Sequence, residues 1–308
     1  MTGHTSTPEN QRRIVVAGGG PAAHRFADAM HTRGLEGWHV TVLTEEAHVP
    51  YDRVTLSKAL TDVDYDLTLG DMSMWEHESI SLRTGERVVK INPEAKSVET
   101  AAGNTYDYDH LVVATGSDAA QLPFPGGELA HVYRTLDDVW AINKAIAELT
   151  EKLGRTVRTV TIGGGLLGLE AAAGTMELGA QATVINGSRW LMNAQLDEGA
   201  GQALGRLVTA KGLEVLTGTY PAEVLSDDGQ VTGVLMKDGR VIPADMVIAS
   251  IGIRPRDELF RGTEGAADGP TVERLFELGK KGGVVINDHC ATPVPGIWAI
   301  GEVANFDG

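Results

Sequence analysis

The sequence contains a single cysteine, Cys290, among its 308 residues. One thiol forms neither an internal disulfide nor a Cys-x-x-Cys redox pair, and it cannot hold an iron–sulfur cluster. Proteins without disulfides are typical of reducing compartments, so we expect a cytoplasmic protein. A reactive role for Cys290 would need a partner thiol, which the sequence lacks, so we expect this side chain to be an inert packing residue.

Long apolar runs and excess positive charge are also missing. The first eleven residues are polar and lack the apolar core of a signal peptide, and no stretch approaches the length that spans a bilayer. The 26 basic residues are outnumbered by 42 acidic ones, and a net charge of −16 disfavours binding to a phosphate backbone. We therefore expect a soluble protein that binds neither membrane nor nucleic acid. The nine histidines show no metal-ligand spacing, so no metal site is predicted.

Glycine, by contrast, is abundant, with 38 residues. Two glycine-rich turns each follow a short apolar strand pattern and precede a helical pattern that leads to a second strand. The first such unit covers residues 14–43 and the second covers residues 160–185. Two copies of this β-turn-α-β unit predict an α/β fold with two Rossmann-like dinucleotide-binding domains in tandem.

The first turn, residues 18–23, reads GGGPAA and has the form G-x-G-x-x-A. Gly18 permits the tight turn, Gly20 lets a pyrophosphate approach the backbone, and Ala23 still allows close packing of strand and helix. The diphosphate would lie at the N-terminus of the helix, where free amides favour anions. A carboxylate at the end of the second strand would bind the ribose hydroxyls. The residues predicted to contact this dinucleotide are Gly18, Gly20, Pro21, Ala23 and Glu45.

The second turn begins the run GGGLLGLE at residues 163–170, a full G-x-G-x-x-G. Its second strand ends in Asn186, which can bond a ribose hydroxyl but does not repel a 2′-phosphate as a carboxylate would. Arg189 could pair with that phosphate, although a solvated surface role explains it equally well. The choice between NADH and NADPH therefore stays open. The predicted contacts of this unit are Gly163, Gly165, Leu166, Gly168, Glu170, Asn186 and Arg189.

Two further motifs carry a resemblance to a known family. Residues 108–116 read YDHLVVATG, and residues 296–304 read GIWAIGEVA. In this order with the two turns, they resemble the flavoproteins with two dinucleotide-binding domains, over residues 12–308. The resemblance implies FAD in the first domain and NAD(P)H in the second. It also implies that FAD is contacted by Ala114, Thr115, Gly116, Gly301 and Glu302, the last replacing the Asp of most members.

The resemblance also implies the domain boundaries. We expect a disordered tail at residues 1–11 and a discontinuous FAD-binding domain formed by residues 12–122 and 253–308. The NAD(P)-binding domain, residues 123–252, is inserted between them. The interface domain that closes the family's fold and often mediates dimerisation is not found before residue 308, so a homodimer is expected only of a longer chain.

Residues 50–58, PYDRVTLSK, resemble the segment beside the isoalloxazine in ferredoxin- and rubredoxin-reductase-like members and in the large subunit of assimilatory NAD(P)H nitrite reductase. By that likeness Arg53 and Lys58 are the expected catalytic residues, because cations there stabilise the anionic reduced flavin. Gly252 matches a loop that passes the nicotinamide. Val88 matches a position whose backbone meets the adenine, and a buried strand valine accounts for it equally well.

The YDRV run and the GEVA ending are most similar to the nitrite reductase subunit. The predicted function is a module that passes hydride from NAD(P)H to FAD and electrons onward to a siroheme and iron–sulfur module or to a small redox protein. Two alternatives stay open: a ferredoxin- or rubredoxin-type reductase, and a fragment that binds nucleotides without activity. One cysteine cannot hold a cluster, so nitrite reduction by this chain alone is not expected.

Overall fold

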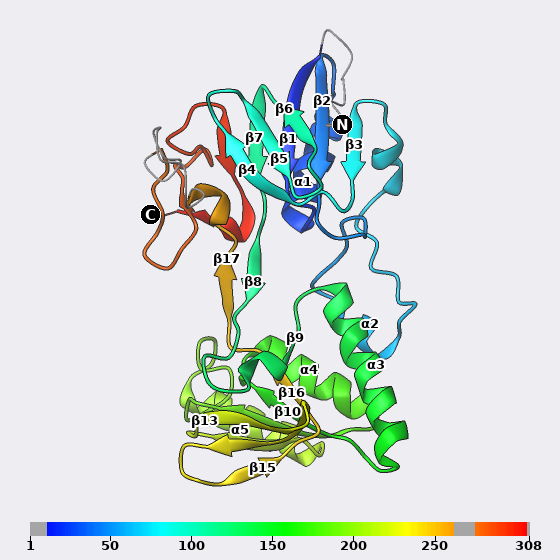
Figure 1. Cartoon of the computed structure of the whole chain (residues 1–308), viewed down its shortest axis with the longest axis vertical. Helices are drawn as coiled ribbons and strands as arrows, with labels where there is room; N and C mark the ends of the chain where they lie inside the picture. The colour runs from blue at the N-terminus through cyan, green and yellow to red at the C-terminus, as the bar shows by residue number, and fades with distance from the viewer. Residues whose placement is uncertain (1–10, 262–274, 307–308) are drawn as a thin grey trace. The chain divides into compact units, whose positions relative to one another are not determined.

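The computed structural model describes residues 11–261 and 275–306. The chain divides into two compact units, drawn in Figure 1. The first consists of Met1–Asp52, Thr68–Asp118 and Arg254–Gly308, and the second of Arg53–Leu67 and Ala119–Ile253. Apart from Gln11, the tail expected at residues 1–11 lies outside the described residues.

The first unit is built on a five-stranded parallel sheet in the order β19-β7-β1-β2-β3. Its strands are β1 (Arg12–Ala17), β2 (Trp38–Leu43), β3 (Ile80–Arg83), β7 (His110–Val113) and β19 (Ile297–Ala299). Residues 14–17 of β1 form a continuous apolar run because both faces of the strand are covered there. Ile14 and Val16 pack against α1 (Pro21–Arg33), whereas Val15 and Ala17 belong to the core on the opposite face.

That opposite face of the first sheet is covered by a small antiparallel sheet. Its strands are β4 (Val88–Asn92), β5 (Ser97–Thr100) and β6 (Thr105–Asp107). The remaining elements of the unit are short: η1 (Met72–Glu76), η3 (Glu258–Phe260), β18 (Val284–Val285), η5 (Gly301–Val303) and β20 (Ala304–Asn305). The chain passes from one unit to the other within β8 (Ser117–Ala119) and within β17 (Ile253–Pro255), and also on either side of residues 53–67.

The second unit repeats the plan with a parallel sheet in the order β12-β11-β10-β16-β9. Its strands are β9 (His131–Val132), β10 (Arg158–Ile162), β11 (Gln181–Asn186), β12 (Glu214–Thr217) and β16 (Met246–Ala249). Its helices are α2 (Leu56–Thr61), α3 (Leu136–Leu153), α4 (Leu166–Glu177), α5 (Glu198–Ala210) and η2 (Gly127–Leu129). An antiparallel sheet of β13 (Pro221–Asp227), β14 (Gln230–Met236) and β15 (Val241–Pro243) completes it. The fold class is therefore α/β with two Rossmann-like domains, as the two turns predict.

Residues 53–67, which we expected in the first domain, belong by their contacts to the second unit. The cause is the packing of α2 on α3 and α4. The amide of Asn143 donates to the Leu60 carbonyl at 2.8 Å, and Leu60 is fully buried. A side chain at Gly174 would bring a Cβ within 2.4 Å of a Leu60 methyl group, so glycine is what allows α2 to approach α4.

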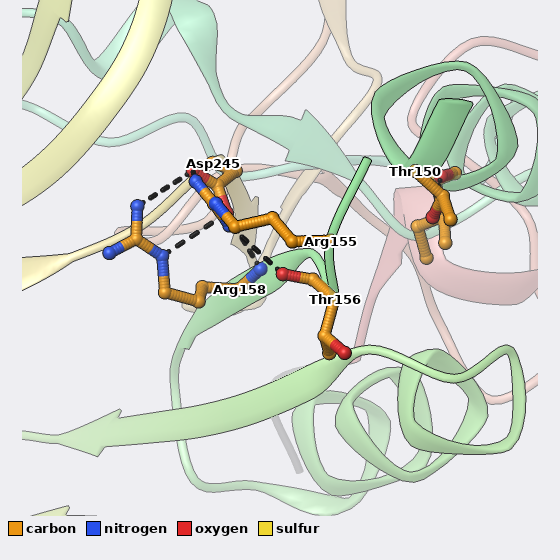
Figure 2. A network of polar contacts seen from close by, with 6 residues as sticks. Thr150, Arg155, Thr156, Arg158 and Asp245 are labelled. Atoms are coloured by element: carbon orange, nitrogen blue, oxygen red, sulfur yellow. Dashed lines mark hydrogen bonds and ion pairs between the residues drawn. The ribbon is translucent and has the colours of Figure 1, made fainter. Parts of the chain in front are cut away.

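In both units an aspartate that precedes one strand is bonded to an arginine of the neighbouring parallel strand. We call this contact, at the amino ends of the two strands, an Asp–Arg clasp. In the second unit, Asp245 precedes β16 and accepts hydrogen bonds from the Arg158 backbone amide at 2.9 Å and from the Arg155 and Arg158 guanidinium groups (Figure 2). In the first unit, Asp109 precedes β7 and accepts from the Arg13 amide at 2.7 Å. Each clasp fixes the register of two neighbouring parallel strands.

No helix in the described ranges is long and apolar enough to cross a membrane.

Candidate functional site

The first glycine turn connects β1 to α1 and is shaped by close contacts of its backbone. Gly18 has φ +117°, and a Cβ there would lie 2.2 Å from the Ala114 carbonyl oxygen. Gly20 is the N-cap of α1 and offers no side chain to its first amides. Pro21 occupies the first helical position, where a missing N–H costs nothing. The helix N-terminus is thereby left open to an anionic group.

Three predicted segments of the first unit meet around this turn. A Cβ at Gly301, where φ is +73°, would lie 3.1 Å from the Ala22 side chain, so η5 begins against the first turn of α1. Glu302 accepts a hydrogen bond of 2.6 Å from the Ser117 hydroxyl. The Ala114 carbonyl already touches Gly18. The structure thus brings the turn, the segment after β7 and the start of η5 together.

Glu45, the predicted ribose ligand, follows β2 and lies between two arginines. Its carboxylate is 3.2 Å from the Arg256 guanidinium and 3.5 Å from that of Arg87. Arg256 also pairs with Asp118, and its carbonyl accepts from the Thr115 hydroxyl at 2.8 Å. Neither arginine is predicted from the sequence, because nothing in the local pattern around it indicates its partner. Their guanidinium groups hold the carboxylate in place at the end of β2.

Three other predicted residues, Val88, Arg53 and Lys58, lie outside the glycine turns. The Val88 side chain is buried in the core of the first unit with Leu43 and Val15, as a strand valine should be. Its backbone contact with an adenine stays a prediction. Arg53 and Lys58 belong to the second unit, with Lys58 exposed on α2. Their place beside a flavin ring also stays a prediction.

The second glycine turn repeats the first between β10 and α4. Gly163 has φ +122°, and a Cβ there would lie 2.0 Å from the Ser250 carbonyl oxygen. A Cβ at Gly168 would lie 2.0 Å from the Gly163 carbonyl, so the helix approaches the turn too closely for alanine. Gly165, the N-cap of α4, differs, because a Cβ there would meet no protein atom within 4 Å. The space that a side chain would fill is thus open beside the helix N-terminus.

This space belongs to a pocket of about 860 Å³ at the carboxyl ends of the strands. Its volume lies in the range of ligand sites, and its position in an open α/β sheet is where ligands bind. The exposed side chains of Leu166, Ile251 and Ile253 give it an apolar wall. Its charged lining residues are Arg134 and Lys237, with no carboxylate among the residues that line it. A negatively charged nucleotide with an apolar ring fits such a lining.

Asn186 lines the pocket at the end of β11, but its side chain is engaged with the backbone. Its oxygen accepts from the Gly164 amide at 3.2 Å, and its amide group donates to the carbonyls of Ser188 and Trp190 at 3.2 and 2.8 Å. It therefore braces the loop after β11. Arg189 is exposed and is not among the lining residues. The contacts predicted from these two residues to a ribose or a 2′-phosphate stay predictions.

Glu170 and Gly252 complete the predicted set. Burial raises the pKa of the Glu170 carboxyl, and burial and the Glu170 charge both raise the pKa of Tyr133, which lines the pocket. Gly252 also lines the pocket, with φ +117° and its carbonyl accepting from the Ala120 amide at 2.9 Å. Within residues 11–261 and 275–306, no group of His, Cys, Asp and Glu is arranged to hold a metal ion.

A family model described as pyridine nucleotide-disulphide oxidoreductase matches residues 12–307. The chain is 35% identical to the NAD(P)H nitrite reductase of Bacillus subtilis (strain 168), over 97% of this chain and 35% of that protein. It is 32% identical to the ferredoxin reductase component of a chlorobenzene dioxygenase from Cupriavidus sp. (strain PS12), over 95% of this chain and 67% of that protein. The chain spans about a third of the length of the nitrite reductases that it matches.

Solved structures show the same arrangement of elements. A covalent complex of putidaredoxin reductase and putidaredoxin matches with a TM-score of 0.82 and 28% identity, over 96% of this chain and 69% of that one. The ferredoxin reductase of the CYP199A2 system from Rhodopseudomonas palustris matches with a TM-score of 0.83 and 25% identity, over 97% of this chain and 70% of that one.

Proposed function

Since the chain belongs to the pyridine nucleotide-disulphide oxidoreductase family, we propose that it is the flavoprotein part of an NAD(P)H nitrite reductase. It is an NAD(P)H-dependent oxidoreductase whose cofactors are FAD and NAD(P)H. The observation that carries the proposal is the pair of glycine turns, each opening a helix N-terminus at the end of a central parallel strand. We assign FAD to the turn of the first unit and NAD(P)H to that of the second.

The residues of the first unit bind and orient FAD in this proposal. Amides at the start of α1 receive the diphosphate, and Glu45 binds the ribose hydroxyls while Arg256 and Arg87 hold its carboxylate in place. Glu302, bonded to Ser117, is the carboxylate for the ribityl hydroxyls. FAD held by these residues would supply the redox chemistry, because a flavin can take up a hydride and give up electrons one at a time.

The residues of the second unit bind NAD(P)H and exclude water. The amides at the start of α4 receive the diphosphate beside Gly165, and Leu166 and Ile251 cover the nicotinamide end of the pocket. Arg53 and Lys58 supply the positive charge that stabilises reduced flavin. The acceptor is a siroheme and iron–sulfur module of the longer protein, which would dimerise through its interface domain. The single cysteine supports a reducing, cytoplasmic location.

The first test is an anaerobic titration of the FAD-loaded chain with NADPH and then with NADH, following the visible absorption of the flavin. We expect bleaching by at least one nucleotide, reoxidation by ferricyanide, and no consumption of nitrite by the chain alone. Flavin that neither nucleotide bleaches would overturn the proposal, and so would a chain that takes up no FAD.

A matched pair of glycine variants locates the hydride donor. A Cβ meets no protein atom within 4 Å at either Gly165 or Gly205, and neither residue has a positive φ. Gly165→Ala fills the space reserved for the diphosphate, so we expect the KM for NAD(P)H to rise at least tenfold. Gly205→Ala, at a position of α5 where a Cβ meets no other atom, should leave it unchanged. Equal KM values for the two variants would place the nucleotide elsewhere.

A second candidate function is the reduction of a small electron carrier. It is favoured by the likeness to the ferredoxin reductase component of the chlorobenzene dioxygenase and to putidaredoxin reductase. Saturable reduction of a purified [2Fe–2S] ferredoxin at micromolar concentration would support it. Transfer to ferredoxin no faster than to a non-physiological protein acceptor such as horse cytochrome c would count against it.

A further inference from the structure

A lysine and a tyrosine that line the nucleotide pocket form a contacting pair. Tyr220 precedes β13, and Lys237 follows β14. The Lys237 amide donates to the Tyr220 carbonyl at 2.9 Å, and the Lys237 ammonium lies 5.6 Å from the centre of the Tyr220 ring. The backbone bond and the cation–π contact restrict where this exposed cation can lie.

The tyrosine places the pair at the end of β11. Gly187 is the first residue after that strand, and a Cβ there would lie 2.4 Å from the Tyr220 ring. The ring therefore covers the backbone at the position where a Rossmann domain holds the adenosine ribose of its nucleotide. The cation above the ring lies on the same side of the pocket, which both residues line.

The charges around the pair favour an anion. No carboxylate lines the pocket, although the whole chain carries a net charge of −16. In the part of the chain that the structure describes, no carboxylate lies within ion-pair distance of Lys237, and the neighbouring Asp238 is paired with Arg240 at 2.7 Å. Asn186 supplies no negative charge at the end of β11, and its side-chain amide is already hydrogen-bonded to backbone groups. A carboxylate that would repel a 2′-phosphate is missing where it would act.

We propose that the second unit prefers NADPH over NADH and that Lys237, held over Tyr220, binds the 2′-phosphate. This inference rests on the proposed function, because it concerns the same NAD(P)H site. Lys237 lies about fifty residues beyond the second strand of its Rossmann unit, too far along the chain for the sequence pattern to indicate it. The pattern indicates Arg189, which follows that strand directly. Arg189 is exposed and does not line the pocket.

The test measures binding directly, by calorimetry on the FAD-loaded chain, with 2′,5′-ADP and 5′-AMP as the probes. We expect 2′,5′-ADP to bind at least tenfold more tightly, as one charge-assisted contact to a phosphate provides. Lys237→Gln should lower this ratio of dissociation constants at least tenfold, and Lys237→Arg should restore most of it. Lys211→Gln, an exposed lysine of the same unit, is the control for a change in net charge.

Two results would overturn the inference. One is a ratio near one in the unmodified chain, and the other is a preference that disappears in Arg189→Gln but survives Lys237→Gln. If neither probe binds and neither nucleotide bleaches the flavin, the proposed function fails and the inference fails with it. Binding of both probes with equal affinity, with bleaching intact, overturns the inference alone.

Discussion

The two glycine turns of this chain have almost the same backbone but different surroundings. Gly18 and Gly163 have φ of +117° and +122°, and each would place a Cβ within 2.2 Å of the carbonyl oxygen of the residue that follows the neighbouring strand. The N-caps Gly20 and Gly165 have φ,ψ of −83°, −175° and −82°, −177°. Anion binding by helix amides depends on this backbone alone, which explains why both units repeat it.

The surroundings differ where each second strand ends. In the first unit the group is a carboxylate, Glu45, held by two arginines. In the second unit the group is Asn186, whose side chain is hydrogen-bonded to the backbone of the neighbouring loops. The cation that lines the pocket there is Lys237. Under the proposed function, this difference predicts that the turn determines whether a dinucleotide binds and that the residues beyond the second strand determine which one.

The largest expected effect comes from the third position of the second turn. Gly168→Ala places a methyl group 2.0 Å from the Gly163 carbonyl oxygen, which only a backbone shift can relieve. We expect the free energy of unfolding to fall by about 3 kcal/mol, with loss of NAD(P)H binding. Urea denaturation followed by circular dichroism measures the change. Gly205→Ala, in open space on α5, is the control and should be neutral or stabilising.

The second expected effect compares the two Asp–Arg clasps. The Asp245 side chain is 8% exposed and binds two arginines, whereas that of Asp109 is 40% exposed and binds Arg13. Asp245→Ala leaves two guanidinium groups without their partner, so we expect a loss of about 2 kcal/mol in unfolding free energy. Asp109→Ala should cost about 1 kcal/mol or less, as for exposed pairs. Equal losses would show that burial does not decide the strength of the clasp.

The same clasps predict the response to acid. Burial alone would raise the pKa of Asp245, but the bonds from Arg155 and Arg158 outweigh it and hold this pKa well below its usual value. A carboxyl with a depressed pKa stabilises the fold above its unfolded pKa, about 3.9, and loses that contribution as pH falls toward the folded value. Asp245→Ala should therefore flatten the fall in stability below about pH 5. An unchanged pH profile would contradict this.

Much of this fold could be predicted from the sequence, because its signals are local. The apolar run before Gly18, the glycine spacing and the start of α1 lie within a few residues of one another, and the same is true around Gly163. The segments 114–116 and 301–302 could be connected with the first turn only through the family resemblance. The structure places Ala114 against Gly18 of the turn and Gly301 against Ala22 of α1.

The remaining features depend on contacts between residues far apart in the chain. Lys237 meets Tyr220 through a hairpin, and Arg256 meets Glu45 after the whole second unit has intervened. Neither contact leaves a periodic pattern. The segment 53–67 joins the second unit because Leu60 fits the groove that Gly174 leaves on α4, a fit of shape that composition does not reveal.

The third expected effect concerns the proposed ribose site of the first unit, where a carboxylate stands in place of the asparagine of the second unit. Glu45→Gln removes the charge that would bind the ribose hydroxyls and leaves Arg256 and Arg87 facing a neutral amide. We expect the dissociation constant of FAD to rise about tenfold, which corresponds to about 1.4 kcal/mol. Fluorescence of released flavin measures it, and Glu94→Gln, an exposed acid of the same unit, is the control. An unchanged constant would remove Glu45 from the FAD site.

The smallest expected effect comes from an alanine-to-glycine substitution at Ala23, which occupies in the first turn the position that Gly168 occupies in the second. Ala23 is fully buried at the third position of its turn, which shows that α1 stands far enough from Gly18 to admit a methyl group. Ala23→Gly should cost about 1 kcal/mol in unfolding free energy, because glycine lowers helix stability and the small methyl contact is lost. FAD binding should persist, since the amides at the start of α1 are untouched. A loss as large as that of Gly168→Ala would show that the Ala23 methyl group contributes far more to the packing of α1 than helix propensity and one small contact account for.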